Sequence, residues 1–194
     1  TTEIYTLSLH DALPIYLICN GQSDFYRIEI DKGIDQTYIL NIDASNNTNF
    51  RLFGVTNMQS SPPANPPPSI ENANALGLLA GTVRLGPNIV ILSLADNNVY
   101  NIDLDAQLWL DGANVTFTSV AGSTNSVVVY GSLRVSGMAN FNANGGQGIV
   151  MRDQSALIIE SGTVTTDCIR TSYISGAHRG AFTMSGGKIG RAHV

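Results

Sequence analysis

A repeat of about 25 residues is the feature that most constrains how this chain can fold. Four glycines stand at this same interval: Gly112, Gly137, Gly162 and Gly187. Ahead of each glycine, two apolar residues flank one variable residue: Leu108 and Leu110, Leu133 and Val135, Leu157 and Ile159, Phe182 and Met184, with a weaker copy at Val83 and Leu85. A fixed period of this length is typical of a solenoid, in which each repeat buries its apolar face against its neighbours. The alternation of apolar and variable residues has the period of a strand, so we expect coils of a parallel β-helix.

Two further apolar columns keep the same period. One follows the glycines, at Ile89 and Ile91, Val115 and Phe117, Phe141, and Val164; the other precedes each repeat, at Ile102 and Leu104, Val127 and Val129, and Ile149 and Met151. The sequence therefore predicts an all-β fold: a right-handed parallel β-helix (solenoid) with about 25 residues per coil and three strands per coil. The alternative is a β-sandwich, which has turns roughly every 8–12 residues without a sustained long period.

The two ends of the chain have an unusual origin on our interpretation. Residues 1–15, TTEIYTLSLHDALPI, and residues 189–194, IGRAHV, resemble translations of the synthetic adapters that are ligated to DNA fragments for sequencing. We interpret both segments as adapter-derived artefacts. We expect them to be disordered or weakly packed, with Ile189 extending the last strand by one residue. On this interpretation the residues between them are an internal piece of a longer protein.

The rest of the chain divides into three segments by composition. We expect an irregular β region or first coils over residues 16–57, and the coils of the β-helix over residues 82–188. Residues 58–81 form a proline-rich loop or linker, because proline lacks the backbone donor that a central strand needs. Within that segment, residues 70–79 have the composition of one short helical turn.

Charge and residue usage limit the chemistry of the chain. The formal net charge is −5, which disfavours a nucleic-acid partner because such proteins carry clustered basic faces. Without the two terminal segments, His178 is the one histidine left, so a multi-histidine metal site is excluded. Cys19 and Cys168 lie near opposite ends of the predicted stack, too far apart for a disulfide, so we expect two free, buried thiols.

A coil with three short strands resembles the pectate-lyase-like superfamily and related bacterial surface proteins. The resemblance covers residues 82–188, extends loosely to residues 25–53, and depends on the periodicity and not on a catalytic motif. It implies a secreted or cell-surface protein in an extracellular, carbohydrate-rich setting. Polysaccharide lyases of this fold generally combine an arginine or lysine base with acidic calcium ligands, and the hydrolases use clustered aspartates.

Three aspartates are the candidate metal site. Asp103 and Asp105 lie two residues apart and would share one face of a strand, and Asp111 follows one short strand later. Carboxylate oxygens are the ligands that Ca²⁺ prefers, so Ca²⁺ is the cofactor this trio would hold. The alternative is that Asp103 and Asp105 are ordinary charged residues on the solvent-exposed outer face of a strand. No residue is assigned as catalytic.

A polar cluster near the end of the coils is the first candidate ligand site. It comprises Arg152, Asp153, Arg170, His178 and Arg179, of which the last two lie in an expected loop over residues 173–180. A histidine beside arginines and an aspartate suits acid–base chemistry or the binding of an anionic sugar. The alternative is a set of surface ion pairs, Arg152 with Asp153 and Arg170 with Asp167, which contribute about 0–1 kcal/mol each.

Trp109 is the second candidate ligand residue. It occupies the variable position between Leu108 and Leu110, so its side chain should point outward, where an indole can stack on a sugar ring. Equivalent positions in the other repeats hold Arg84, Arg134, Ile158 and Thr183, which do not continue an aromatic strip.

The functional expectation is a structural or adhesive β-helix segment of a secreted or cell-surface bacterial protein that binds glycans. The alternative is a polysaccharide lyase or glycoside hydrolase whose catalytic coils lie partly outside this sequence. Expected partners are polysaccharides or host-cell-surface glycans and further coils of the same chain, with no nucleic acid and no membrane span within these residues. Because the ends of the stack lack caps, their open strand edges should promote association.

Overall fold

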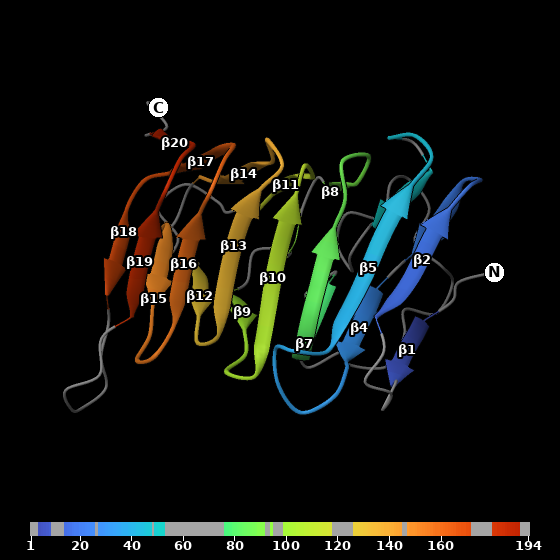
Figure 1. Ribbon diagram of the computed structural model, residues 1–194, viewed down its shortest axis with the longest axis horizontal. Coiled ribbons are helices and arrows are strands. Elements are labelled where there is room, and N and C mark those ends of the chain that lie inside the picture. The colour runs from blue at the N-terminus through green and yellow to red at the C-terminus, as the bar shows by residue number, and fades with distance from the viewer. Residues whose placement is uncertain are drawn as a thin grey trace, which may run out of the picture.

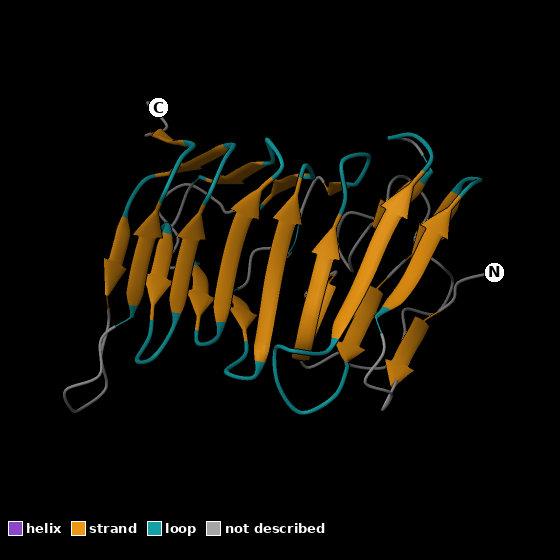
Figure 2. Ribbon diagram, viewed as in Figure 1, coloured by secondary structure: helices purple, strands orange, loops and turns teal. Residues whose placement is uncertain are grey.

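A computed structural model describes residues 4–8, 14–25, 27–47, 49–52, 76–91, 94, 99–117, 126–144, 147–171 and 180–190. The regular elements in these ranges are strands, and their pairings are all parallel (Figure 2). The chain is thus an all-β parallel solenoid, which confirms the fold class and excludes the sandwich. Within the same ranges, no helix has the length and apolar character that crossing a membrane would require.

The largest sheet runs the length of the stack. Seven strands form its main path: β1 (Ile4–Ser8), β4 (Arg27–Asp31), β7 (Leu76–Leu85), β10 (Ala106–Asp111), β13 (Ser132–Ser136), β16 (Ala156–Ile159) and β19 (Ala181–Met184). Two further strands join it beside this path, β2 (Ile15–Cys19) and β5 (Ile39–Ala44), with β5 pairing with both β2 and β7. We call the part formed by β2, β5, the second half of β7, β10, β13, β16 and β19 the front sheet, which faces the viewer in Figure 1.

The other two faces of each coil are formed by shorter strands. The second face comprises β8 (Val90–Ile91), β11 (Asn114–Thr116), β14 (Asn140–Ala143), β17 (Thr163–Thr166) and β20 (Lys188–Gly190). The third face comprises β9 (Tyr100–Ile102), β12 (Val127–Val129), β15 (Ile149–Met151) and β18 (Ile169–Thr171). A separate pair, β3 (Ser23–Phe25) and β6 (Phe50–Leu52), belongs to the first coils.

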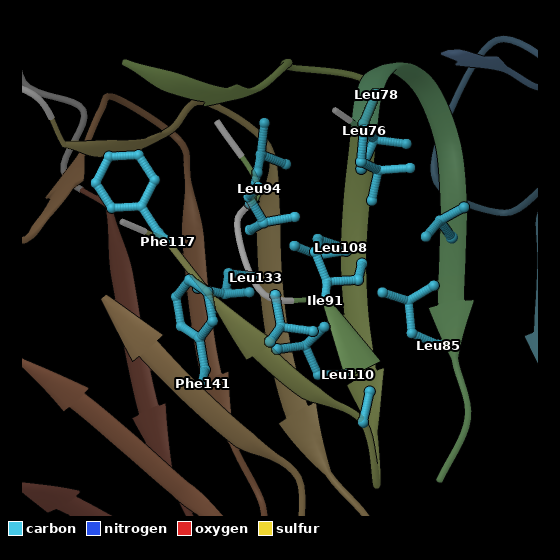
Figure 3. Packing of buried hydrophobic residues seen from close by; sticks show 14 of the residues in the cluster. Leu76, Leu78, Leu85, Ile91, Leu94, Leu108, Leu110, Phe117, Leu133 and Phe141 are labelled. Atoms are coloured by element: carbon cyan, nitrogen blue, oxygen red, sulfur yellow. The ribbon is translucent and has the colours of Figure 1, made fainter. Parts of the chain in front are cut away.

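Residues one repeat apart lie directly on top of each other, as the sequence predicts. Along the front sheet Val83 pairs with Leu108, Leu108 with Leu133, Leu133 with Leu157 and Leu157 with Phe182. On the second face Val115, Phe141 and Val164 pair in the same way. Except for Phe182, which is 49 % exposed, these side chains are buried in one continuous core, where Figure 3 shows Leu108, Leu133 and Phe141 together.

Burial of this core is the main stabilising force of the stack. Leu108, Leu133 and Leu157 are each 0 % exposed, and burial of a leucine side chain contributes about 1.5–3 kcal/mol. Because each apolar residue contacts its equivalents one coil away, every coil depends on its neighbours for that burial.

The four evenly spaced glycines lie at corners of the coils. Gly112, Gly137, Gly162 and Gly187 have φ of 89°, 59°, 94° and 77°, in the left-handed region that favours glycine. At Gly162 a Cβ would lie 2.2 Å from the carbonyl oxygen of Ala139, one coil away. These corners turn the chain from the front sheet to the second face, and they leave no room for a side chain.

The first half of the chain contributes coils of the same kind. In chain order β2, β3 and β4 form one coil and β5, β6 and the first half of β7 form the next. β7 covers two faces, because it turns at Gly81, whose φ is 85°: its first half pairs with β4 and its second half with β5 (Figure 1). Of the expected loop over residues 58–81, the described part, from Leu76 onward, is strand rather than a helical turn.

Two smaller expectations were wrong. Leu104 is not in the inward column of the third face: it is 55 % exposed in the turn after β9, where the backbone N–H of Ala106 bonds to the carbonyl of Asp103, and Tyr100 fills the inward position. Cys19 and Cys168 are both free thiols, but Cys168 is exposed, because it lies in the corner between β17 and β18.

The terminal segments contribute strands where they are described. β1 lies within residues 1–15 and pairs with β4, and β20 includes Ile189 and Gly190, so the last strand extends one residue further than expected. Ile189 is 41 % exposed, which agrees with the weak packing expected there. The adapter origin of these segments stays a prediction.

Candidate functional site

The structure does not bring the three candidate metal ligands together. Asp103 and Asp105 lie in the turn before β10, whereas Asp111 is the last residue of that strand. A strand of this length separates its two ends by roughly 16 Å. Among the described residues, no group of three or more histidine, cysteine, aspartate or glutamate side chains is placed to hold a metal ion.

Asp103 lies beside a buried tyrosine. Tyr100 is 0 % exposed, and its hydroxyl has no hydrogen-bond partner. Burial, and after it the charge of Asp103, raises the pKa of Tyr100 well above its ordinary value. Burial also raises the pKa of the Asp103 carboxyl, since a partly desolvated carboxylate is less stable than the neutral acid.

Trp109 points outward, as predicted, but two arginines cover its ring. Arg84 and Arg134 hold the equivalent positions on the strands at either side of β10. Their guanidinium carbons lie 5.5 Å and 4.1 Å from the centre of the indole ring. Both distances are within the range of a cation–π contact, so the stacking of the coils sandwiches Trp109 between two cations.

The edge of the indole is held by hydrogen bonds. Trp109 Nε1 donates to Ser136 Oγ at 2.8 Å, and Ser136 Oγ donates to Asp111 Oδ1 at 2.8 Å. Arg84 donates to the other Asp111 oxygen, from Nε at 2.8 Å and also from Nη2. Arg84 reaches Asp43 as well, with Nη1 3.6 Å from Oδ2.

The same face continues one coil further. Arg134 Nε and Nη2 donate to the two carboxylate oxygens of Glu160 at 3.1 and 3.0 Å, a bidentate pair. Together these contacts form what we call the outer ladder: Asp43, Arg84, Trp109, Asp111, Arg134, Ser136 and Glu160. The ladder connects five successive strands of the front sheet, namely β5, β7, β10, β13 and β16, to whose end Glu160 is attached.

The ladder sets the protonation of Asp111. Its partial burial acts to raise the pKa, but the hydrogen bonds from Ser136 and Arg84, with the charges of Arg84 and Arg134, outweigh burial and lower the pKa of Asp111 below its ordinary value. Asp111 is therefore a firmly ionised link between two arginines, and a carboxylate held in this way stabilises the ladder at neutral pH.

The second candidate cluster is placed only in part. Arg152 follows β15, and its guanidinium carbon lies 5.7 Å from the centre of the Tyr130 ring. Asp153 is in the turn after it, and Arg170 is exposed on β18, the strand that pairs with β15. His178 and Arg179 lie outside the described residues.

Sequence reasoning missed most of the ladder. The variable positions of the front sheet were compared only for a continued aromatic strip. The informative pattern was instead the presence of cationic, aromatic and acidic residues that can pair with one another one repeat apart. Arg84, Trp109 and Arg134 occupy the same position in three successive repeats. Glu160 lies two residues beyond Ile158, which pairs with Arg134, just as Asp111 lies two residues beyond Trp109, which pairs with Arg84.

Comparisons with known proteins gave no further identification. No family model matches the chain, and neither a curated protein nor a solved structure matches it.

Proposed function

We propose that this chain is a structural segment of a secreted or cell-surface bacterial protein, a stalk that also adheres to glycans. The observation that carries the proposal is the outer ladder, in which charged side chains are used to tie coil to coil. A stalk needs such ties because each coil is held only by its neighbours, and the weakest junction limits the whole stack.

The ladder adds to the junctions that the backbone and the core already form. Its ion pairs are partly exposed, with side chains 23–37 % accessible, so solvent screening limits each to about 0–1 kcal/mol. Two cation–π contacts of about 0.5–1 kcal/mol each join them. These small terms are spread over five strands, so they support the four junctions between β5 and β16 rather than a single one.

The adhesive part of the proposal depends on the resemblance to the pectate-lyase-like superfamily and on Trp109. The indole is half-buried on the outward side of the front sheet, and Arg84 and Arg134 beside it already pair with Asp111 and Glu160. The carboxylates of an acidic polysaccharide would compete with these pairs for the two guanidinium groups. The expected partners are polysaccharides or host-cell-surface glycans, with further coils of the same protein extending the stalk.

A polysaccharide lyase or glycoside hydrolase is the alternative function. It is favoured by Asp103, because a carboxyl whose pKa is raised by burial suits a general acid. On this alternative Asp103 would be the acid, and the groups that complete the site would come from outside the described residues.

One experiment separates the two functions. The chain would be incubated with acidic and neutral polysaccharides, and both binding and the appearance of new chain ends would be measured. The stalk proposal expects binding without products, and weaker binding for Trp109→Ala than for the outward-facing control Ile158→Ala. New polysaccharide ends that no longer form with Asp103→Asn would favour the enzyme. If Trp109→Ala and Ile158→Ala bind the polysaccharides equally well, Trp109 has no adhesive role.

Mechanical pulling tests the stalk itself. When the two ends are pulled apart with optical tweezers, the segment should resist until coils peel off, and Ser136→Ala should lower the force because it removes the link between Trp109 and Asp111. An unfolding force unchanged by Ser136→Ala would show that the ladder does not reinforce the stack.

A further inference from the structure

We propose that the loop over residues 32–38 is a strap that locks two blocks of the stack together across a weakly joined coil junction. The first block comprises the coils from β2 to the first half of β7, and the repeat block comprises the coils from the second half of β7 onward. Release of the strap would let the two blocks separate between β5 and β7. The proposal concerns how the stack opens and is independent of the glycan function.

The junction between the two blocks has strand pairing on one face instead of three. At the start of the repeat block, adjacent coils are joined on every face, by the pairs β7 with β10, β8 with β11 and β9 with β12. Between the blocks, the only pairing among the described strands is that of β5 with β7, because β8 and β9 begin the sheets of the second and third faces. A solenoid opens where its coils are least connected, so this junction is the weak point of the described stack.

The strap reaches across this junction to three places in the repeat block, all through Gln36. Its side-chain amide donates to the carbonyl of Leu104 at 3.3 Å and accepts from Ser132 Oγ at 2.8 Å. Its backbone carbonyl accepts from Thr82 Oγ1 at 2.6 Å. Figure 1 shows the loop between β4 and β5 extending along the lower end of the front sheet to the base of β10.

The length of this reach is unusual for a solenoid. Ser132 lies on β13, which is three strands from β5 and therefore about 14 Å away across the sheet. Contacts in a solenoid normally join adjacent coils only. A single residue that bonds to β13 and to the turn before β10 therefore holds several coils of the repeat block to the first block at once.

Burial on the outer side of the front sheet shows what the strap covers. Thr82 and Ser132 alternate with the inward Val83 and Leu133, so both face outward. They are nevertheless only 1 % and 7 % exposed. Ala156 follows Ser132 in the same row, makes no bond to the strap and is less buried. The strap thus takes the place of solvent over the outward row where the two blocks meet.

The loop is preformed to hold Gln36 in this position. At its base, Tyr38 packs so closely on Gly33, whose φ is 74°, that a Cβ there would lie 2.2 Å from the ring. At its tip, Asp35 Oδ1 accepts from the backbone N–H of Thr37 at 2.8 Å, a local turn that fixes the chain around Gln36. Because the base and the tip are both fixed, little conformational freedom is lost when Gln36 binds the repeat block.

Hydrogen exchange of backbone amides measures the opening of this junction directly. The N–H groups of Thr82 and Gly86, which we call the junction amides, donate across it to carbonyls of the first block, at 2.7 and 2.9 Å. Glu160 supplies the reference, because its N–H makes the equivalent bond to β13 inside the repeat block, at 2.9 Å. In the parent, the junction amides should be protected as well as Glu160, since the strap closes the weak junction.

Gln36→Ala removes both side-chain bonds of the strap. The protection of the junction amides should then fall roughly tenfold, whereas that of Glu160 should stay unchanged. Ser132→Ala removes one of the two bonds and should have a smaller effect. Adding Ser132→Ala to Gln36→Ala should change nothing further, because the bond between these residues is already absent.

A matched control changes the other glutamine near the junction. Gln107→Ala lies between Thr82 and Ser132 in the outward row and removes none of the strap's bonds, so its exchange should match the parent. Circular dichroism checks that every variant keeps its strands. The proposal is overturned if the parent's junction amides exchange much faster than Glu160, or if Gln36→Ala leaves them unchanged. It is equally overturned if Gln107→Ala acts as strongly as Gln36→Ala, or if Gln36→Ala lowers the protection of Glu160 to the same extent.

Discussion

The interior column of the front sheet gives the sharpest energetic prediction, through the substitution Leu133→Ala. Leu133 is 0 % exposed and lies between Leu108 and Leu157, one coil to either side. Removing the outer carbons of such a side chain leaves a cavity that the stacked backbones cannot close, because strand spacing fixes the distance between coils. We expect the free energy of unfolding to fall by about 2–5 kcal/mol.

The same sheet supplies an internal comparison. Met184 ends the neighbouring column and is 44 % exposed, so much of its apolar surface already contacts water. Met184→Ala should therefore cost about 1 kcal/mol or less. Arg134→Ala, on the outward side of the strand that holds Leu133, should cost about 0.5–2 kcal/mol, since it removes a partly exposed pair with Glu160 and a cation–π contact with Trp109.

Urea unfolding followed by circular dichroism and by Trp109 fluorescence measures all three values, on samples dilute enough to keep the chain monomeric. Agreement between the two probes shows that the transition is cooperative. The reasoning is refuted if Leu133→Ala costs less than about 1 kcal/mol, or if Met184→Ala costs as much as Leu133→Ala. Either result would mean that the cost of truncating an inward side chain of the front sheet does not follow its burial.

Three further predictions concern Gly162, Asp111 and the two cysteines. Gly162→Ala should lower stability by about 1–3 kcal/mol, because φ is 94° and the new Cβ would meet the backbone of Ala139 in the preceding coil. The control Gly21→Ala, with nothing within 4 Å, should change little in the same urea titration. Because the pKa of Asp111 is lowered in the folded protein, its carboxylate adds stability above the unfolded-state pKa of 3.8, and this stability is lost as the pH falls below that value. Acid should therefore lower the melting temperature of the parent more steeply than that of Asp111→Asn. Parallel melting curves of the two proteins across that pH range would contradict the assignment. A thiol reagent should label Cys168 at once and Cys19 only after unfolding, and equal rates would contradict the burial of Cys19.

Much of the fold could be predicted because one physical constraint repeats. An apolar residue that must stack on its equivalent one coil away recurs at a fixed spacing, and so does the glycine at each corner. The strand columns and the repeated glycines Gly112, Gly137 and Gly162 could therefore both be found from the sequence. The exceptions are local. Leu104 looks like a strand residue by hydropathy, but the turn that begins at Asp103 ends the strand first.

The first coils were harder to predict, because their period is broken. Gly81 lets β7 pass from one face to the next within one strand, with a register shift against β4 between Leu78 and Ala80, so the repeat has no clear boundary there. The candidate site was the least predictable part. Asp111 was selected as a metal ligand for its charge, yet its partners are Arg84 and Ser136 on the adjacent strands, and only the register of the strands brings them within bonding distance.

Methyl-to-methyl NMR contacts test the central claim most directly. With the leucine methyl groups labelled, Leu133 should give cross-peaks to both Leu108 and Leu157, which lie one coil away at about 4.8 Å between strands. Leu108 and Leu157 are two coils apart, roughly 10 Å, and should give none to each other. A spectrum in which Leu133 contacts neither neighbour would contradict the stacking of like residues on which this account depends.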